Sequence, residues 1–192
     1  MDSKVIWRRR VILMLIVGLV VAVPITVLIR GGDGDEPATV GAAPTQMPTP
    51  ETGPDERDKG LGVSYRVPKG WDESKEASAI RLSAPDKTAQ VVIAAPAPAE
   101  DADVLLRETL AAFKTQYKKV KVAPGSGREV GGVKAKGAVI TARRKGRELR
   151  VLVAVAPAKK KAYLVEVFTT ANVSPSSLRE AQVALNSLEF EK

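Results

Sequence analysis

The run from Val11 to Ile29 contains nineteen residues and no charged side chain. As an α-helix, nineteen residues at ~1.5 Å each extend about 28 Å, close to the ~30 Å hydrocarbon core of a bilayer. Because Lys and Arg resist translocation, we expect residues 1–10 to stay in the cytoplasm, Val11–Ile29 to span the cell membrane once, and the rest to be extracytoplasmic. The lipid bilayer is then the first expected partner. The charges that set this orientation are Lys4, Arg8, Arg9 and Arg10 before the run and Asp33, Asp35 and Glu36 after it.

A cleaved signal peptide is the alternative interpretation of this segment, because it also begins with basic residues and an apolar core. Val20 and Ala22 could be the small residues before a cut. A signal core usually has ~7–15 residues, whereas this apolar run continues to Ile29 without a polar break. We therefore favour an uncleaved transmembrane helix, and the sequence leaves cleavage open.

Residues 30–60 are expected to form a disordered linker. The segment from 31 to 60 holds five prolines and seven acids, and it has no aromatic residue. Such a composition cannot bury enough apolar surface to fold. The sequence therefore predicts a Pro-rich acidic tether that ends at Gly60, followed by one folded domain over residues 61–192.

The chain has no cysteine and no histidine. The missing cysteine excludes disulfides, thiol chemistry, iron–sulfur clusters and the acylated cysteine of a bacterial lipoprotein. The missing histidine excludes Ser–His–Asp triads and the usual zinc sites. No catalytic residue, cofactor or metal site is predicted, and we expect a protein that is not an enzyme.

The folded part of the chain is basic. From residue 61 onward, 23 Lys and Arg face 14 Asp and Glu. A surplus of this kind attracts anionic surfaces. Because the domain is expected outside the membrane, we expect its partner to be an envelope protein or an anionic surface, such as phospholipid headgroups or acidic wall polymers. No nucleic acid is expected.

Hydrophobic patterning predicts an α+β domain with an antiparallel sheet of about six strands and two main helices. Segments in which apolar and polar residues alternate between turn residues predict the strands. The strand at 147–156 is apolar on both faces, which favours a sheet covered on both sides. The expected strands are 63–67, 79–83, 90–95, 120–123, 133–143, 147–156 and 162–170.

Two amphipathic helices are expected to cover this sheet. The first runs from about Asp103 to Tyr117, with Asp101 or Asp103 as its N-cap. The second begins with Ser174 as N-cap and Pro175 in the first turn. Their predicted buried stripes are Leu106, Leu110, Phe113 and Tyr117, and Leu178, Ala181, Leu185 and Leu188.

The opening Val67-Pro68-Lys69-Gly70-Trp71, the order of the elements and Gly131-Gly132-Val133 before the meander resemble the PsbP-like fold family. Within that family the chain is most similar to the LpqN-type actinobacterial envelope lipoproteins, over about residues 61–191. The resemblance implies an antiparallel sheet with packed helices, used as a binding or accessory module without catalytic residues. Those lipoproteins are held by an acylated cysteine, which this chain lacks, so Val11–Ile29 is its expected anchor.

Trp71 and two basic clusters are the candidate interaction residues. Trp71 could be a stacking platform, although a Trp in this position more often covers the edge of a core. Consecutive turns of a meander lie at opposite ends of a sheet, ~30 Å apart for ten-residue strands, so the clusters are expected to form two separate poles. Solvated turn tips are the plain interpretation, and a patch that faces the membrane or wall is the functional one. The clusters are Arg143, Arg144, Lys145 and Arg147 at one turn, and Lys159, Lys160 and Lys161 at the next.

Glu166 is the only acid in the last long strand. A carboxylate in apolar surroundings can be an acid with a raised pKa, but pairing with Arg150 across the strands is favoured. No second carboxylate or nucleophile accompanies it, so catalysis is not expected.

A carrier of a small apolar or lipidic ligand is the alternative function. Small residues on the predicted sheet, such as Ala135, Gly137 and Ala154, leave room for a cavity between sheet and helix.

Overall fold

The computed structural model describes residues 50–76, 78–96, 101–125, 128–158 and 161–191. The predicted cytoplasmic segment, the predicted transmembrane helix and most of the predicted linker lie outside the described residues. Within the described part, no helix is long and apolar enough to cross a bilayer.

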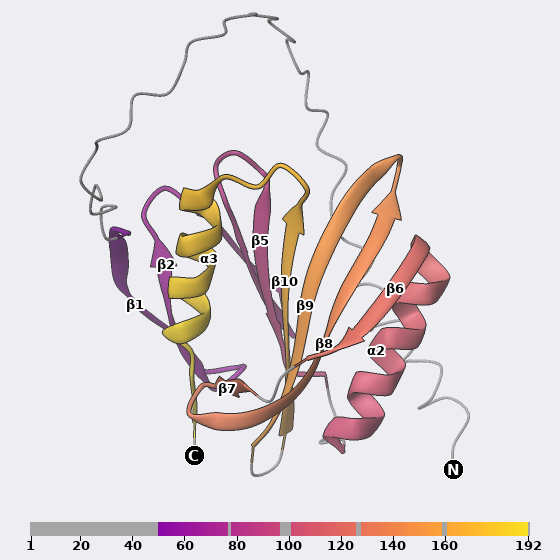
Figure 1. Ribbon diagram of the computed structural model, residues 1–192. Coiled ribbons are helices and arrows are strands. Elements are labelled where there is room, and N and C mark those ends of the chain that lie inside the picture. The colour runs from indigo at the N-terminus through magenta and orange to yellow at the C-terminus, as the bar shows by residue number, and fades with distance from the viewer. Residues whose placement is uncertain (1–49, 77, 97–100, 126–127, 159–160, 192) are drawn as a thin grey trace, which may run out of the picture.

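Two antiparallel sheets and two helices make up the described domain (Figure 1). The larger sheet has eight strands, in the order β3-β4-β5-β10-β9-β8-β6, with β7 pairing with β8 beside this path. The smaller sheet has the order β1-β2-β11. The bounds are β1 (Thr52–Asp58), β2 (Val63–Pro68), β3 (Asp72–Glu76), β4 (Ala79–Ser83), β5 (Ala89–Ala94), α2 (Ala102–Gln116), β6 (Lys118–Pro124), β7 (Arg128–Val130), β8 (Val133–Arg144), β9 (Arg147–Ala158), β10 (Lys161–Thr170), α3 (Pro175–Asn186) and β11 (Glu189–Phe190).

Both helices begin at the caps that the sequence predicts. The Asp101 side chain accepts a hydrogen bond from the Asp103 backbone N–H at 2.8 Å, which satisfies a free donor of the first turn of α2. Ser174 Oγ accepts from the Ser177 N–H at 3.1 Å, and Pro175 occupies the first turn of α3. The N-terminus of each helix is therefore set by local sequence.

The large sheet is buried on both faces, because β9 and β10 carry apolar side chains on each. One face, here called the α2 face, packs Leu164 and Phe168 of β10 against Leu105 and Phe113 of α2. The other, the α3 face, buries Val165 of β10 with side chains of α3 and of the small sheet. The prediction of an α+β domain with a sheet covered on both sides is confirmed.

The number of strands and the end of the linker differ from the predictions. The large sheet alone exceeds six strands. The linker does not extend to Gly60, because Thr52–Asp58 forms β1 and pairs antiparallel with β2. An edge strand is held mainly by backbone hydrogen bonds, so a polar segment without a hydrophobic pattern can form one. Ion pairs also hold β1 in place: Arg57 with Glu191 at 2.8 Å, Lys69 with Glu51 at 2.5 Å, and Arg66 with Asp55.

The buried stripes of the helices are shifted from those predicted. In α2 the deepest residues are Leu105, Thr109 and Phe113, while Leu106 and Leu110 are partly buried. In and after α3, Ala181, Leu185 and Leu188 are buried as predicted, but Leu178 is 50% exposed. The exposure of Leu178 marks a place where α3 does not meet the sheet.

Candidate functional site

A groove of about 690 Å³ lies between α3 and strands β8, β9 and β10. It exists because α3 packs over β2 and β5 and leaves the α3 face of β8 and β9 partly open. The lining residues come from four strands, the loop after β10, and α3: Arg128, Val139, Glu148, Arg150, Leu152, Val167, Thr169, Thr170, Ala171, Val173, Leu178, Arg179, Ala181, Gln182 and Leu185.

The floor of the groove is apolar. Val139, Leu152 and Val167 lie side by side in one row, because Val139 pairs with Leu152 and Leu152 pairs with Val167 across the strands. Leu178 and Leu185 of α3 add an apolar wall. Leu178 is exposed, Val139 and Leu152 are partly exposed, and Val167 and Leu185 are buried, so the groove offers a small apolar surface to a partner or ligand.

The rim of the groove carries charge. Arg150 and Thr169 form the next row of the floor toward the β8–β9 turn, and Arg128 lies on β7. Arg128 and Arg150 are exposed, and neither side chain forms an ion pair with another residue of the described part. The rim can therefore receive an anionic or hydrogen-bond-accepting group.

The small residues expected to leave room for a cavity do not line this groove. Ala135 and Ala154 are 4% exposed, and a side chain at Gly137 would come within 2.5 Å of the Val153 carbonyl oxygen. Arg128 of β7 pairs with Ala135, so the short β7 hairpin lies against this end of β8. An opening between sheet and helix does exist, but it begins one row further along the strands.

Trp71 lies at the edge of the core. Its side chain is 7% exposed, and its Nε1 donates a hydrogen bond to Glu180 Oε2 at 2.9 Å. Buried Trp side chains normally place the N–H on an acceptor in this way. The position favours the structural role for Trp71, which joins the turn after β2 to α3.

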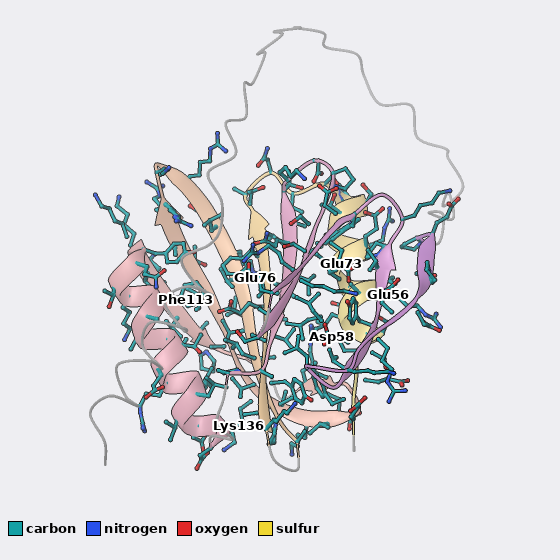
Figure 2. All side chains as sticks on the ribbon, turned by 180° about the vertical axis from the view of Figure 1, so that it is seen from behind. Glu56, Asp58, Glu73, Glu76, Phe113 and Lys136 are labelled. Atoms are coloured by element: carbon teal, nitrogen blue, oxygen red, sulfur yellow. The ribbon has the colours of Figure 1, made fainter. Side chains whose placement is uncertain are left out.

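The basic cluster predicted at the β8–β9 turn is joined in the structure by lysines that are distant from it in sequence. Strand β6 pairs with β8 so that Lys118 lies opposite Arg143, which joins the lysines at the end of α2 and the start of β6 to this turn. Figure 2 shows nitrogen-tipped side chains projecting around this end of β8, β9 and α2. We call this group the basic pole; its members are Lys114, Lys118, Lys119, Lys121, Arg143, Arg144, Lys145 and Arg147.

The second predicted cluster is described only in part, because Lys159 and Lys160 lie outside the described residues. Lys161 Nζ donates to the backbone carbonyls of Gly60 at 3.4 Å and Leu61 at 3.3 Å. Lys161, at the start of β10, and the β8–β9 turn lie at opposite ends of the sheet (Figure 1). Lys161 helps to hold the β1–β2 turn.

Glu166 is fully buried on the α2 face. Neither carboxylate oxygen has a hydrogen-bond partner among the described residues, and burial raises the pKa of this side chain to about 8. Pairing with Arg150 is wrong: Arg150 is the cross-strand partner of Thr169 and faces the groove, whereas Glu166 lies opposite Val153 on the other face. Side chains alternate between the two faces along a strand, so Glu166 and Thr169, which are three positions apart, lie on opposite faces. Arg150 lies beside Thr169 and is therefore on the face opposite Glu166.

Acidic side chains of β1 and β3 gather near Tyr65, and Figure 2 labels Glu56 and Glu73 among them. Lys75 Nζ lies 3.6 Å from Glu56 and 3.4 Å from Glu73, and Tyr65 donates a hydrogen bond to Glu73. Lys75 thus compensates part of the negative charge of this group. Among the described residues, no group of three or more acidic side chains is arranged to hold a metal ion.

No protein-family model matches the chain, and no curated protein matches it in sequence. Solved structures match it in fold. CyanoP, the cyanobacterial PsbP of Synechocystis sp. PCC 6803, is 8% identical, with a TM-score of 0.53 over 79% of this chain and 98% of that one. A protein of Bacteroides thetaiotaomicron is 14% identical, with a TM-score of 0.50 over 72% of this chain and 48% of that one. The chain thus spans about half the length of the Bacteroides protein.

LpqN, described as involved in cell envelope biogenesis of Mycobacterium tuberculosis, is 14% identical, with a TM-score of 0.47 over 68% of this chain and 83% of that one. At such identities a likeness concerns the fold alone. The match to CyanoP over nearly its whole length defines the described domain as a PsbP-like fold.

Proposed function

We propose that this chain is a membrane-anchored, extracytoplasmic binding domain without enzymatic activity, which assists another protein of the cell envelope as the LpqN-type resemblance suggests. The groove beside α3 carries the proposal. Its apolar floor and its exposed Leu178 are a surface that a folded domain normally covers. The envelope location is supported by the uncharged run Val11–Ile29.

The shape of the groove favours a protein partner. Leu178 is half exposed, and Gln182 and Arg150 on the rim are exposed as well. A small apolar ligand in such an open trough would keep part of its surface in water, whereas a partner protein brings its own cover. An extended segment that lies along β8 and β9 would meet the apolar row and then Arg150.

The absence of enzymatic activity is supported by the chemistry of the side chains. The chain has neither cysteine nor histidine. Glu166, a carboxyl group whose pKa is raised by burial, lies on the α2 face of the sheet, away from the groove. A catalytic acid must reach a substrate proton within hydrogen-bond distance.

A carrier of a small apolar or lipidic ligand is the second candidate function. It is favoured by the groove volume of about 690 Å³ and by the apolar row Val139, Leu152 and Val167. Small-molecule sites commonly enclose ~300–1,000 Å³ and are lined mostly by apolar side chains.

Position-specific photo-cross-linking in cells of the source organism tests the proposal. A photoreactive residue at Gln182, in the groove, is expected to give a protein adduct of defined mass. The matched control is Glu108, which is exposed on the outer side of α2 and is expected to give none. Adding Leu178→Asp should reduce the Gln182 adduct about tenfold, because it places a charge on the apolar wall.

Equal adducts from Gln182 and Glu108, or no protein adduct from either, would contradict binding of a protein in the groove. Native mass spectrometry of the purified chain separates the second candidate, since a carrier retains a small apolar ligand that Leu178→Asp releases.

A further inference from the structure

The basic pole joins two segments that are separate in sequence. Residues 114–121 contain four Lys and no acid, and residues 141–148 contain four Lys or Arg and one acid, Glu148. The pairing of β6 with β8 places these segments side by side. Together these two segments carry eight cations and one carboxylate.

Most of these charges are exposed and uncompensated. Seven of the eight side chains are exposed, and Arg144 is half-buried over the ring of Tyr117 at 5.6 Å. Arg143 lies 3.9 Å from Glu148. The other six form no ion pair with a residue of the described part.

Several basic residues elsewhere on the domain are paired, although others, such as Arg128 and Arg150, form no ion pair within the described part. Arg57, Lys69, Lys87 and Lys136 each form an ion pair with an acidic side chain of the described part. Arg66 pairs with Asp55. The six unpaired side chains of the pole lie together on two adjoining segments, where they produce a local positive potential.

The pole also lies at the end of the molecule where the chain enters the domain. Figure 1 shows that the first residues of β1 and the β8–β9 turn lie at the same end, opposite the start of β10. About twenty residues separate Ile29 from β1, and a chain of that length reaches at most ~70 Å. An anchor in the bilayer would therefore keep the pole within reach of the same membrane surface at a high effective concentration.

We propose that the basic pole binds the anionic headgroups of the bilayer and holds the domain with the β8–β9 turn toward the membrane. The cations come from α2, β6 and the β8–β9 turn and project outward without converging on a cavity. A spread of this kind fits a flat, multivalent anionic surface better than a single small anion. Each Lys or Arg near such a surface adds to binding, and salt screens the attraction.

The test uses the full-length chain in lipid nanodiscs. Because the chain has no cysteine, a single introduced cysteine can carry a fluorophore at a chosen position. Thr115→Cys places the reporter beside the pole, and Glu129→Cys places it on β7 at the opposite end of the sheet (Figure 1). Nitroxide-labelled headgroups are expected to quench the Thr115→Cys reporter at least about threefold more in discs with about 30% phosphatidylglycerol than in pure phosphatidylcholine, and about 0.5 M NaCl should remove the difference. The Glu129→Cys reporter should not respond.

A charge-reversed variant and a matched control decide which surface is responsible. Lys118→Glu, Lys121→Glu and Arg147→Glu together should abolish the lipid-dependent quenching. Lys59→Glu, Lys134→Glu and Lys161→Glu together change the net charge equally at the other end and should leave it intact. Equal loss in both variants, quenching that is independent of phosphatidylglycerol, or a pole that responds only to a soluble polyanion would overturn the proposal.

Discussion

Glu166 shows what a single buried carboxyl group does to this fold. It is fully buried among apolar side chains, and neither oxygen has a hydrogen-bond partner in the described part. An ionised carboxylate in this place would be strongly destabilising, so the folded protein holds the neutral acid. The free-energy cost of burying the Glu166 side chain therefore depends on pH.

We expect the stability of the protein to fall between pH 4.5 and pH 8. Burial raises the pKa of Glu166 from 4.5 to about 8, so across this range the unfolded chain releases the proton while the folded chain keeps it. The free energy of unfolding therefore decreases with rising pH, by on the order of 1.4 kcal/mol per unit at most, and levels off above pH 8. Urea unfolding of the wild-type chain and of Glu166→Gln at several pH values measures this.

Glu166→Gln removes the titrating group and should flatten that part of the pH profile. The advantage of the variant over the wild-type chain should accordingly grow from pH 5 to pH 8. Parallel profiles for the two proteins would contradict the assignment of the effect to Glu166.

Two leucines on the helices provide a second contrast at the scale of the residue. Leu105, on the buried side of α2, is 1% exposed, whereas Leu178 of α3 is 50% exposed. We expect Leu105→Ala to lower the free energy of unfolding by about 2–5 kcal/mol and Leu178→Ala by less than about 1 kcal/mol. Chemical denaturation measures both, and a large loss from Leu178→Ala would mean that this side chain supports the fold rather than the groove.

At the scale of the element, β1 shows how a strand can form from a sequence that does not predict one. Its side chains are polar and mostly exposed, and it is held to β2 by backbone pairing from Thr52 to Asp58. An ion pair between Arg57 of β1 and Glu191, the residue after β11, adds a side-chain contact to this pairing. Hydrophobic patterning cannot detect a strand that buries so little.

Two truncations distinguish the contribution of β1 to stability from that of the residues before it. A chain that starts at residue 50 should unfold at nearly the same temperature as the full-length protein. A chain that starts at residue 61 should unfold about 5 °C lower or more, because β2 loses its pairing partner and its edge becomes exposed. Thermal unfolding followed by circular dichroism tests this, and equal midpoints would show that β1 adds no stability.

At the scale of the whole molecule, the sequence was sufficient for the two helices and the longer strands, but not for β1, β3, β7 and β11 or for the surfaces between the elements. The caps Asp101 and Ser174 and the alternation in β8, β9 and β10 are local signals, and the predicted helices and strands follow them. The groove depends on how far α3 extends across the sheet, which is a property of packing. The basic pole depends on Lys118 lying opposite Arg143, which is a long-range pairing.

The predicted pair of Glu166 and Arg150 failed for a related reason. Opposite charges on neighbouring strands make a plausible pair only if the register places them on one face. The register puts Thr169 opposite Arg150 and Val153 opposite Glu166. Arg150 lies three residues from Val153, and an odd offset along a strand places the two side chains on opposite faces.

Strand β6 forms an outer edge of the large sheet, so its backbone is open to pairing with another extended chain. Three of its residues are lysines, the register is irregular between Lys118 and Lys121, and Lys119 has a φ of 53°. Charged side chains and local irregularities on an edge strand hinder the addition of a further strand. The lysines of β6 thus also oppose edge-to-edge aggregation of the domain.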